Sequence, residues 1–180
     1  HDEAYHEFVC IFRHIASSII KYDGLFVHSA VINMDNVGYM FSGKSGVGKS
    51  THINEWVKCF GKDRVKIING DKPLISVSDK IVVYGTPWDG KEKQSKNTSA
   101  EIGGICILRR GKENKIRRIS AVEALGTLMS QTFRPIGKEN MKSVLKNVLT
   151  LSSKVPLWIL ECNISEEAAW TSYNAMCKGE

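Results

Sequence analysis

The sequence lacks the features of a membrane-spanning chain and of a disulfide-stabilised secreted domain. No apolar run approaches the ~20 residues that a transmembrane helix needs. The five cysteines are an odd number, lie far apart and show no C-x-x-C spacing, which argues against a disulfide framework and against a zinc site. We therefore expect a cytoplasmic protein with reduced thiols and no membrane partner. No secretory signal is visible, although the helical pattern is already running at His1, which leaves room for an upstream segment.

The sequence also lacks a basic tail or a strongly basic helix. The net charge is +6, but lysines and arginines are spread over the chain, so nucleic acid is only weakly indicated as a partner. An enzyme with a polyanionic ligand, or one that acts on an acidic peptide, would show the same charge balance. A chain of 180 residues with 42% hydrophobic residues can bury one substantial core, so we expect a single domain over residues 1–180. Whether the chain forms an oligomer stays open.

One phosphate-binding motif is complete. The pattern G-x-x-x-x-G-K-[ST] is matched without mismatch by Gly43, Lys44, Ser45, Gly46, Val47, Gly48, Lys49 and Ser50. An apolar strand candidate (37–42) precedes it and an amphipathic helix candidate (51–60) follows, which is the context that the motif requires. The simpler alternative is a glycine-rich turn that caps a helix.

Each residue type in this loop has a physical reason. Glycines allow the backbone N–H groups to turn inward around phosphate oxygens, and the N-terminus of the following helix attracts the same anion. Lys49 is then the cation for the β- and γ-phosphates, and the Ser50 hydroxyl can ligate Mg²⁺. We therefore expect ATP and Mg²⁺ to bind at residues 43–51, from Gly43 to Thr51.

Hydrophobic periodicity predicts an α/β domain with helices packed on a mixed sheet. Helices are expected over Ala4–Lys21, Thr51–Phe60, Ala121–Gln131 and Glu139–Ser153, and after an N-cap at Ser165. Strands are expected over Leu25–Ile32, Val37–Phe41, Val65–Ile68, Leu74–Val77, Lys80–Tyr84, Ile102–Arg109, Lys115–Ile119 and Pro156–Cys162. Residues 97–101 look exposed, and residues 111–114 look like a hairpin turn. Short neighbouring strands with such turns favour a mixed sheet over regular βαβ alternation.

Two further segments specify which phosphate-binding fold to expect. His28 lies in the strand candidate before the loop, and the segment Ile67-Ile68-Asn69-Gly70-Asp71-Lys72-Pro73 is an apolar strand that ends in an acidic residue. With the loop between them, the chain resembles the HPr kinase/phosphorylase group and its relatives with the phosphoenolpyruvate carboxykinase-like fold. The motifs that carry this resemblance span 28–71, and the remainder matches only by the order of strands and helices. Residues 84–91, with the sequence YGTPWDGK, resemble small homologues of that kinase.

The resemblance implies the role of one carboxylate. Asp71 matches the second of two aspartates that the family uses as metal ligand and catalytic base, while Gly70 stands at the first position. Three alternatives follow: Asp71 serves both roles, a second carboxylate (Asp89 or Glu92) takes one of them, or the chain binds nucleotide without transferring phosphate. A weak base does not exclude transfer, because phosphoryl transfer depends mainly on positioning and charge neutralisation.

Three cationic or titratable residues are further candidates. His28 is either a satisfied structural group or a residue that contacts a γ-phosphate oxygen or orients the acidic group. For His52, early in the loop helix, we favour a structural role. Arg134 follows a helix and is a candidate clamp for the transferred phosphoryl group, its alternative being a helix C-terminal cation.

The 85–93 loop is a candidate acceptor site. It combines Trp88, Asp89 and Lys91 within a few residues of two glycines, and specificity on a rigid scaffold usually resides in such loops. The alternative is a surface loop with Trp88 buried in the core. Together these observations predict an ATP- and Mg²⁺-dependent phosphotransferase that acts on a serine hydroxyl of a protein or peptide. A nucleotide-binding switch or assembly protein without phosphotransfer, and a kinase of a small molecule, remain as alternatives.

Overall fold

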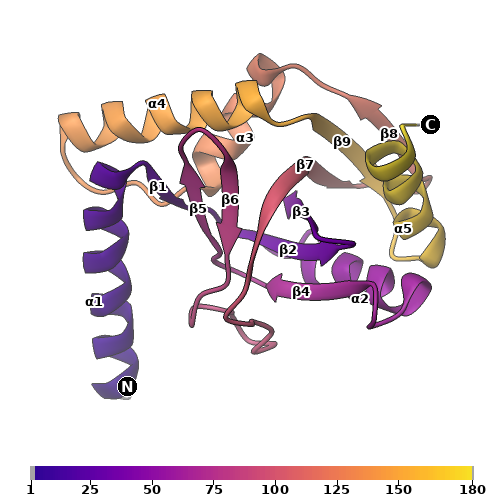
Figure 1. Cartoon of the computed structure of the whole chain (residues 1–180), viewed down its shortest axis with the longest axis horizontal. Helices are drawn as coiled ribbons and strands as arrows, with labels where there is room; N and C mark the ends of the chain where they lie inside the picture. Colours follow the sequence, from indigo (N-terminus) through magenta and orange to yellow (C-terminus); the bar gives the residue numbers. More distant parts are fainter. Residues whose placement is uncertain (1–2, 180) are drawn as a thin grey trace.

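Three parallel strands form the centre of the sheet. In the computed structural model, which describes residues 3–179, β7 (Ser99–Arg110) lies between β3 (Val37–Ser42) and β9 (Leu157–Cys162) and runs parallel to both. The antiparallel strands β2 (Ser29–Met34) and β4 (Val65–Asn69) extend the sheet beyond β3, so that β4 is an edge strand (Figure 1). The sheet is therefore mixed, as the sequence predicted.

On the other side of β7 the sheet divides. The first residues of β7 pair with β6 (Ile81–Tyr84), which continues antiparallel into β5 (Leu74–Val77) and β1 (Gly24–Phe26). The later residues of β7 pair with β9, whose other edge carries the antiparallel strand β8 (Lys115–Arg118). A strand as long as β7 can thus hold two different neighbours along one edge.

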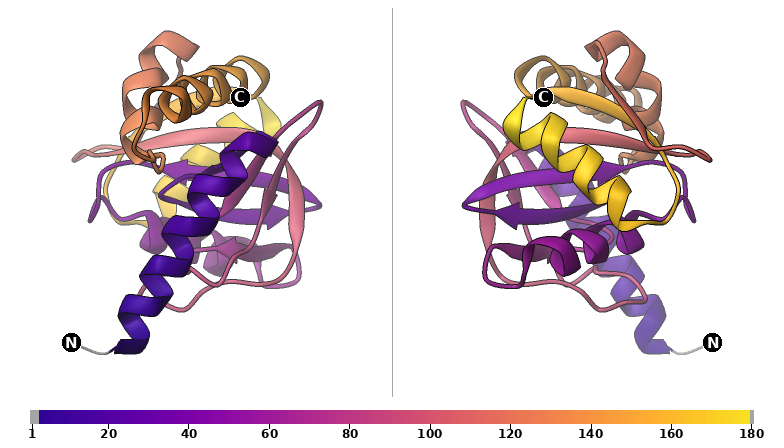
Figure 2. Two further views of the ribbon diagram at one scale, coloured as in Figure 1. Left: turned by 90° about the vertical axis from the view of Figure 1, so that its left-hand side faces the viewer. Right: turned by 90° about the vertical axis from the view of Figure 1, so that its right-hand side faces the viewer.

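Helices cover both faces of the sheet (Figure 2). On one face α3 (Ala121–Gln131) and α4 (Lys138–Lys154) bury Leu128 and Val148. On the other, α2 (Lys49–Phe60) and α5 (Glu166–Tyr173), continued by the π-helical turn η2 (Asn174–Lys178), bury Trp56 among other residues. Because successive strand side chains point to opposite faces, the neighbours Ile105 and Cys106 of β7 belong to different hydrophobic clusters.

The first helix projects from the body of the molecule (Figure 1). It comprises α1 (Glu3–Ser18) and the 3₁₀ turn η1 (Ile19–Tyr22), and only its last turns bury side chains in the core. Within the described residues, 3–179, no helix combines the length and apolarity that crossing a membrane requires.

Two details of the expected strands are wrong. The strand expected over Leu25–Ile32 is two strands, because β1 pairs with β5 whereas β2 pairs with β3 and β4. Residues 111–114 do not close a hairpin, because β9 lies between β7 and β8. Residues 97–101 are exposed as expected except for Ala100, but residues 99–101 also belong to β7, where they pair with β6. Each of these outcomes depends on pairing between segments that are distant in sequence.

Candidate functional site

Three chain segments meet where β3 ends. Ser42, the last residue of β3, lies opposite Ser29 at the start of β2, and β4 ends beside β2 with Asn69 opposite Val31. The backbone N–H of Ser29 donates to the carbonyl of Asp71 at 2.9 Å. This arrangement places the 43–50 loop, His28 and Asp71 at one edge of the sheet.

The 43–50 loop has the strand–loop–helix geometry that its motif predicts. Its three glycines have left-handed φ values of 149°, 74° and 110° at positions 43, 46 and 48, which a residue with a Cβ rarely adopts. At Gly43 a Cβ would also lie 2.8 Å from the carbonyl oxygen of Leu108. Helix α2 begins at Lys49, directly after this loop, so its free N–H groups lie beside the loop.

Lys49 is held against its own loop. Its side chain is only 6% exposed, and Nζ donates to the carbonyls of Gly43 at 3.2 Å and Lys44 at 3.5 Å. Burial lowers the pKa of Lys49, and the charge of Asp71 partly opposes that shift. An anion that entered the loop would offset the cost of burying this ammonium group.

A cavity of about 510 Å³ lies in front of the loop. It brings together most of the site residues that the sequence predicted. Its lining includes His28, Ser45, Gly46, Gly48, Lys49, Ser50, Thr51, Asp71, Asp89 and Lys91.

Asp71 is held by two nitrogen-bearing side chains and by a turn. His28 Nε2 lies 3.1 Å from its Oδ1, and Lys72 Nζ contacts its Oδ2. Burial alone would raise the pKa of Asp71, but the hydrogen bonds from His28 and Lys72 outweigh it and lower the pKa to about 2. The buried amide of Asn69 shapes the turn, because its Oδ1 accepts from the backbone N–H groups of Asp71 and Lys72 at 2.9 and 2.8 Å.

His28 has a protein partner on each ring nitrogen. Besides the contact to Asp71, its Nδ1 lies 3.0 Å from Oε1 of Gln131, at the end of α3. The backbone N–H of His28 donates to the carbonyl of the same glutamine at 2.8 Å. This geometry favours a role for His28 in orienting the carboxylate of Asp71 over a direct contact with a γ-phosphate oxygen. Gln131 gave no signal in the sequence, since its position beside His28 results from tertiary packing.

The 85–93 loop forms a wall of the same cavity. Asp89 and Lys91 line it, together with Gly90 and Glu92. The Asp89 carboxylate accepts a hydrogen bond from the Ser95 hydroxyl at 2.9 Å. The 85–93 loop is therefore adjacent to the 43–50 loop rather than remote from it.

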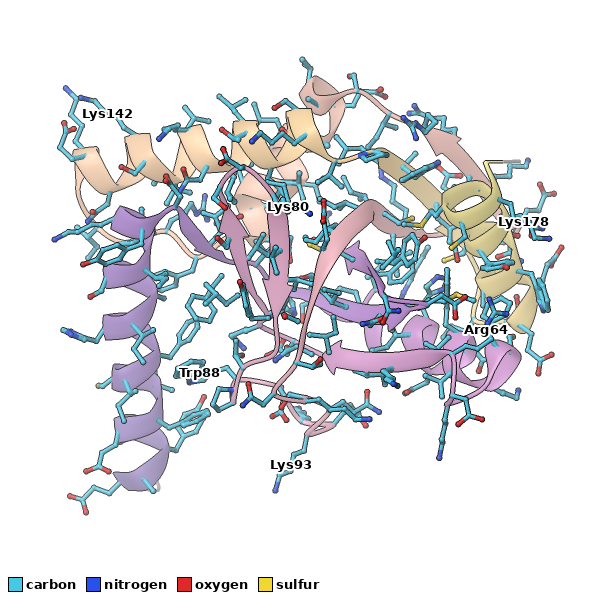
Figure 3. All side chains as sticks on the ribbon, in the orientation of Figure 1. Arg64, Lys80, Trp88, Lys93, Lys142 and Lys178 are labelled. Atoms are coloured by element: carbon cyan, nitrogen blue, oxygen red, sulfur yellow. The ribbon has the colours of Figure 1, made fainter. Side chains whose placement is uncertain are left out.

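Trp88 lies apart from this cavity. Its ring packs on Phe8, Phe12 and Phe26, with centroid distances of 5.7, 5.2 and 5.7 Å, and its Nε1 donates to the carbonyl of Phe8 at 3.4 Å. The expectation that Trp88 belongs to the acceptor site is not supported by this position. The half-buried indole instead attaches α1 to the body (Figure 3), because its packing on phenyl rings removes apolar surface from water.

Two arginines, Arg134 and Arg110, differ in their distance from the 43–50 loop. Arg134 is exposed in the α3–α4 connection and does not line the cavity. Arg110, at the end of β7, donates from Nη2 to the carbonyl of Gly46 in the loop at 2.7 Å. Because β7 runs parallel to β3, the ends of both strands reach the same edge, and only this pairing identifies Arg110 as a neighbour of the loop.

His52 has the structural role that the sequence favoured. It is buried, its Nε2 lies 3.0 Å from the Ser172 hydroxyl, and Trp56 Nε1 donates to that hydroxyl at 2.9 Å. Burial lowers the pKa of His52 to about 4, so the ring is neutral at physiological pH. These contacts join α2 to α5.

The acidic residues around the cavity suit magnesium rather than a transition metal held by protein ligands alone. Among residues 3–179 no group of three or more histidine, cysteine, aspartate or glutamate side chains could hold a metal ion. Magnesium usually takes one or two carboxylates and fills its shell with water and substrate phosphates. Asp71 and the hydroxyl of Ser50, which line one cavity, match that requirement.

The similarity of this chain to known proteins lies in solved structures. No protein-family model matches the chain, and no curated protein matches it. Among solved structures, the Hpr(Ser) kinase/phosphatase from Coxiella burnetii is similar over 84% of this chain and 97% of that chain, with 9% sequence identity and a TM-score of 0.43.

Proposed function

We propose that the protein is an ATP- and Mg²⁺-dependent phosphotransferase of the HPr kinase-like type that acts on a serine hydroxyl of a protein or peptide. The observation that supports this best is the convergence of Lys49, Ser50 and Asp71 on one cavity beside three glycines with left-handed backbone. Phosphate binding, metal binding and acceptor contact each have a residue of the appropriate chemistry there.

The first task of the site is to bind and neutralise the phosphates. Residues of the 43–50 loop and the start of α2 line the cavity, where their free N–H groups would bind phosphate oxygens. Lys49 would exchange its bonds to the loop carbonyls for phosphate oxygens. Asp71 and Ser50 would hold the magnesium ion, which neutralises charge on the phosphates when bound. Arg110 supports the loop through the carbonyl of Gly46.

The second task is the transfer. The oxygen of the acceptor hydroxyl forms a bond to the γ-phosphorus, the bond between that phosphorus and the β–γ bridging oxygen breaks, and the hydroxyl proton passes to a carboxylate. Asp71, with a pKa lowered to about 2, is ionised at neutral pH but is a weak base. Its main contribution is therefore charge and position, which is sufficient for a loose transition state. Asp89 and Glu92 are the other carboxylates on the cavity wall and are alternative proton acceptors.

The acceptor side of the cavity is open. Lys91 and Glu92 are exposed residues of its wall, so a bulky acceptor can reach the cavity from solvent. This feature favours a polypeptide hydroxyl over a small molecule that would be enclosed.

A transfer assay tests the proposal. The protein is incubated with ATP labelled at the γ-phosphate, Mg²⁺ and peptides that each contain one serine, with free serine as the small acceptor and the Asp71→Asn variant as the blank. We expect label on peptide serine that depends on Mg²⁺ and on Asp71. Label on free serine alone would indicate a small-molecule kinase, and ATP binding without transfer to any acceptor would indicate the nucleotide-dependent switch.

A further inference from the structure

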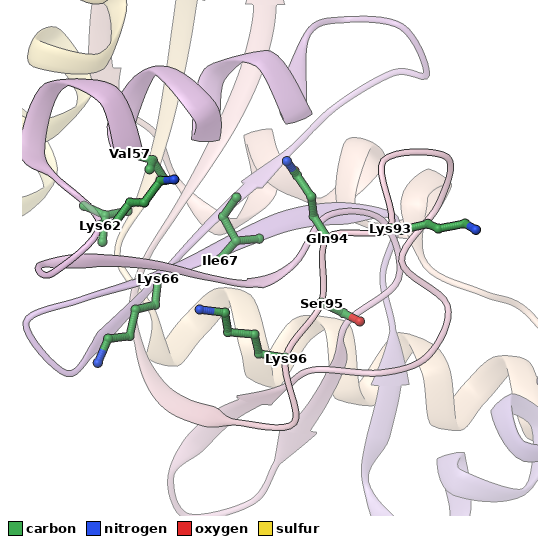
Figure 4. Close-up of a pocket in the computed structure, with 9 residues that line it drawn as sticks. Val57, Lys62, Lys66, Ile67, Lys93, Gln94, Ser95 and Lys96 are labelled. Carbon is green, nitrogen blue, oxygen red and sulfur yellow. The ribbon is translucent and has the colours of Figure 1, made fainter.

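A second cavity lies beside the first, on the other side of the 93–96 segment. We call the first one, which lies in front of the 43–50 loop, the phosphate cavity. The second cavity has a volume of about 330 Å³ and lies between the end of α2, the edge strand β4 and residues 93–96 (Figure 4). We call it the lysine groove, and its lining residues are Val57, Lys62, Val65, Lys66, Ile67, Lys93, Gln94, Ser95 and Lys96.

The lysine groove has unpaired positive charge. Lys62, Lys66 and Lys96 surround Ile67 in Figure 4, whereas the side chain of Lys93 extends away from them. None of these lysines forms an ion pair with another described residue, although six lysines elsewhere do: Lys58, Lys72, Lys80, Lys115, Lys142 and Lys146. Like charges gathered around one cavity repel one another, so an anionic occupant would relieve that repulsion.

The backbone beside the groove is an open sheet edge. β4 is the last strand on its side of the sheet, and the 93–96 segment covers only its end, where Lys96 N–H donates to Ile68 and Gly70 N–H donates to Gln94. No strand of the described chain lies along Lys66 and Ile67 on that edge. An exposed edge of this kind is a template for an extended peptide.

A residue that lines the groove also has a buried polar atom without a partner. The Oε1 atom of Gln94 is inaccessible to solvent and accepts no hydrogen bond from the described residues. An unsatisfied buried acceptor is costly, so a movement of the Gln94 side chain that brings Oε1 to a backbone N–H of a bound peptide would be favourable.

The groove is adjacent to the phosphate cavity. Ser95 lines the groove, and its hydroxyl donates to the carboxylate of Asp89, which lines the phosphate cavity. Residues 89–96 therefore form the wall between the two cavities. If a polypeptide bound in the groove, the residues next to the bound segment in its sequence would lie at the site of phosphoryl transfer.

We propose that the lysine groove binds an acidic segment of the acceptor polypeptide, extended along β4 and adjacent to the serine that is phosphorylated. This inference rests on the proposed kinase function and specifies that the acceptor polypeptide is acidic near its serine. The side chains of glutamate or aspartate pair with Lys62, Lys66 and Lys96, and the apolar floor at Val57 and Ile67 accepts the intervening side chains. A peptide suits the groove better than nucleic acid, because the lining contains no aromatic residue on which a base could stack.

Fluorescence anisotropy tests the proposal without any turnover. The probe is a labelled synthetic peptide in which one serine is flanked by glutamates, and the control peptide has glutamine at each of those glutamates. We expect the acidic peptide to bind more tightly, and the combined variant Lys62→Glu, Lys66→Glu, Lys96→Glu to weaken its binding by about tenfold or more, because three ion pairs are lost. A matched variant, Lys21→Glu, Lys112→Glu, Lys138→Glu, changes the net charge equally on elements outside the groove and should retain most of the binding.

Calorimetry with ATP on the same proteins separates the two proposals. Peptide binding that is lost only in the groove variant, with ATP binding retained, supports the groove even if no phosphate is transferred. Equal weakening in both variants, equal binding of the glutamine peptide, or tighter groove-dependent binding of a single-stranded oligonucleotide would overturn the proposal. If the charge-reversed variant fails to fold, as judged by circular dichroism, lysine-to-glutamine changes at the same positions give the same test with a smaller expected loss.

Discussion

His28 Nε2 lies 3.1 Å from Oδ1 of Asp71, and the other nitrogen of the same ring lies 3.0 Å from Gln131. The three residues come from the bend just before β2, the turn after β4 and the end of α3. This chain of contacts gives Asp71 one orientation at the cavity beside the 43–50 loop. The hydrogen bonds of Asp71 with His28 and Lys72 explain why its pKa lies near 2 despite partial burial. A carboxylate held in this way suits metal binding better than proton abstraction.

Replacement of Lys49 by alanine should weaken ATP binding. The charge-assisted contacts of the ammonium group with phosphate oxygens would be lost, at a cost of about 1.5–3 kcal/mol. Calorimetry with Mg²⁺ measures the change. The control is Lys44→Ala, whose side chain is exposed in the same loop and should change binding by less than about 0.5 kcal/mol. Equal affinity of the folded Lys49→Ala protein and the parent would contradict a nucleotide site at this loop.

The Asp71→Asn variant should lose turnover more than nucleotide binding. Asparagine preserves the size of the side chain but removes the charge that would hold the metal, so the loss should be largest at limiting Mg²⁺. ATP hydrolysis or phosphate transfer as a function of Mg²⁺ concentration measures this effect. If the variant matched the parent at every Mg²⁺ concentration, Asp71 would be structural and another residue would hold the metal.

The Gly90→Ala variant should impair the site through Asp71. Gly90 has a φ of 76°, and a Cβ at this position would lie 2.9 Å from the Cβ of Asp71, so the loop or the carboxylate has to move. We expect reduced turnover with a cooperative thermal transition retained. Gly126→Ala is the matched control, because a Cβ at that position of α3 meets no atom within 4 Å and alanine favours a helix by roughly 1 kcal/mol. Full activity of Gly90→Ala would argue against close coupling between these two residues.

Stability should fall as the pH falls from about 6.5 to about 4 because of His52. Burial lowers its folded-state pKa to about 4, so the unfolded chain binds the proton first and protonation favours unfolding in this range. The difference between the two pKa values corresponds to about 3 kcal/mol of stability. This stability is fully present above the pKa of the unfolded state and is lost as the pH falls to the pKa of the folded state. Urea unfolding at several pH values measures it. His52→Gln should flatten this pH dependence, whereas His14→Gln, at an exposed position of α1, should leave it unchanged.

The Arg110→Ala variant should loosen the phosphate loop. Arg110 donates to the carbonyl of Gly46 at 2.7 Å, and a single exposed hydrogen bond of this kind contributes about 0.5–1.5 kcal/mol. We expect weaker ATP binding within that range, with thermal stability close to that of the parent. Arg134→Ala, which removes an exposed cation outside the cavity, is the control and should leave ATP binding intact. If Arg134→Ala weakened ATP binding and Arg110→Ala did not, Arg134 would again be the candidate phosphate clamp.

The local features of the fold follow from short-range patterns in the sequence. The 43–50 motif, the strand before it and the helix after it follow from glycine positions and apolar periodicity, which act over a few residues. The bounds expected for α3 agree with the structure, and Ser165 caps α5 by accepting from the backbone N–H of Ala168. The mixed character of the sheet followed from short strands separated by tight turns.

Only the tertiary structure decided which distant residues meet. Parallel pairing of β3, β7 and β9 brought Arg110 to the phosphate loop, and packing of α3 placed Gln131 against His28. The burial of Trp88 among three phenyl rings likewise attached α1 and removed that tryptophan from the acceptor site. These contacts join segments far apart in the chain, and their free energy comes from burial and pairing in the folded state, so no local pattern of residues encodes them.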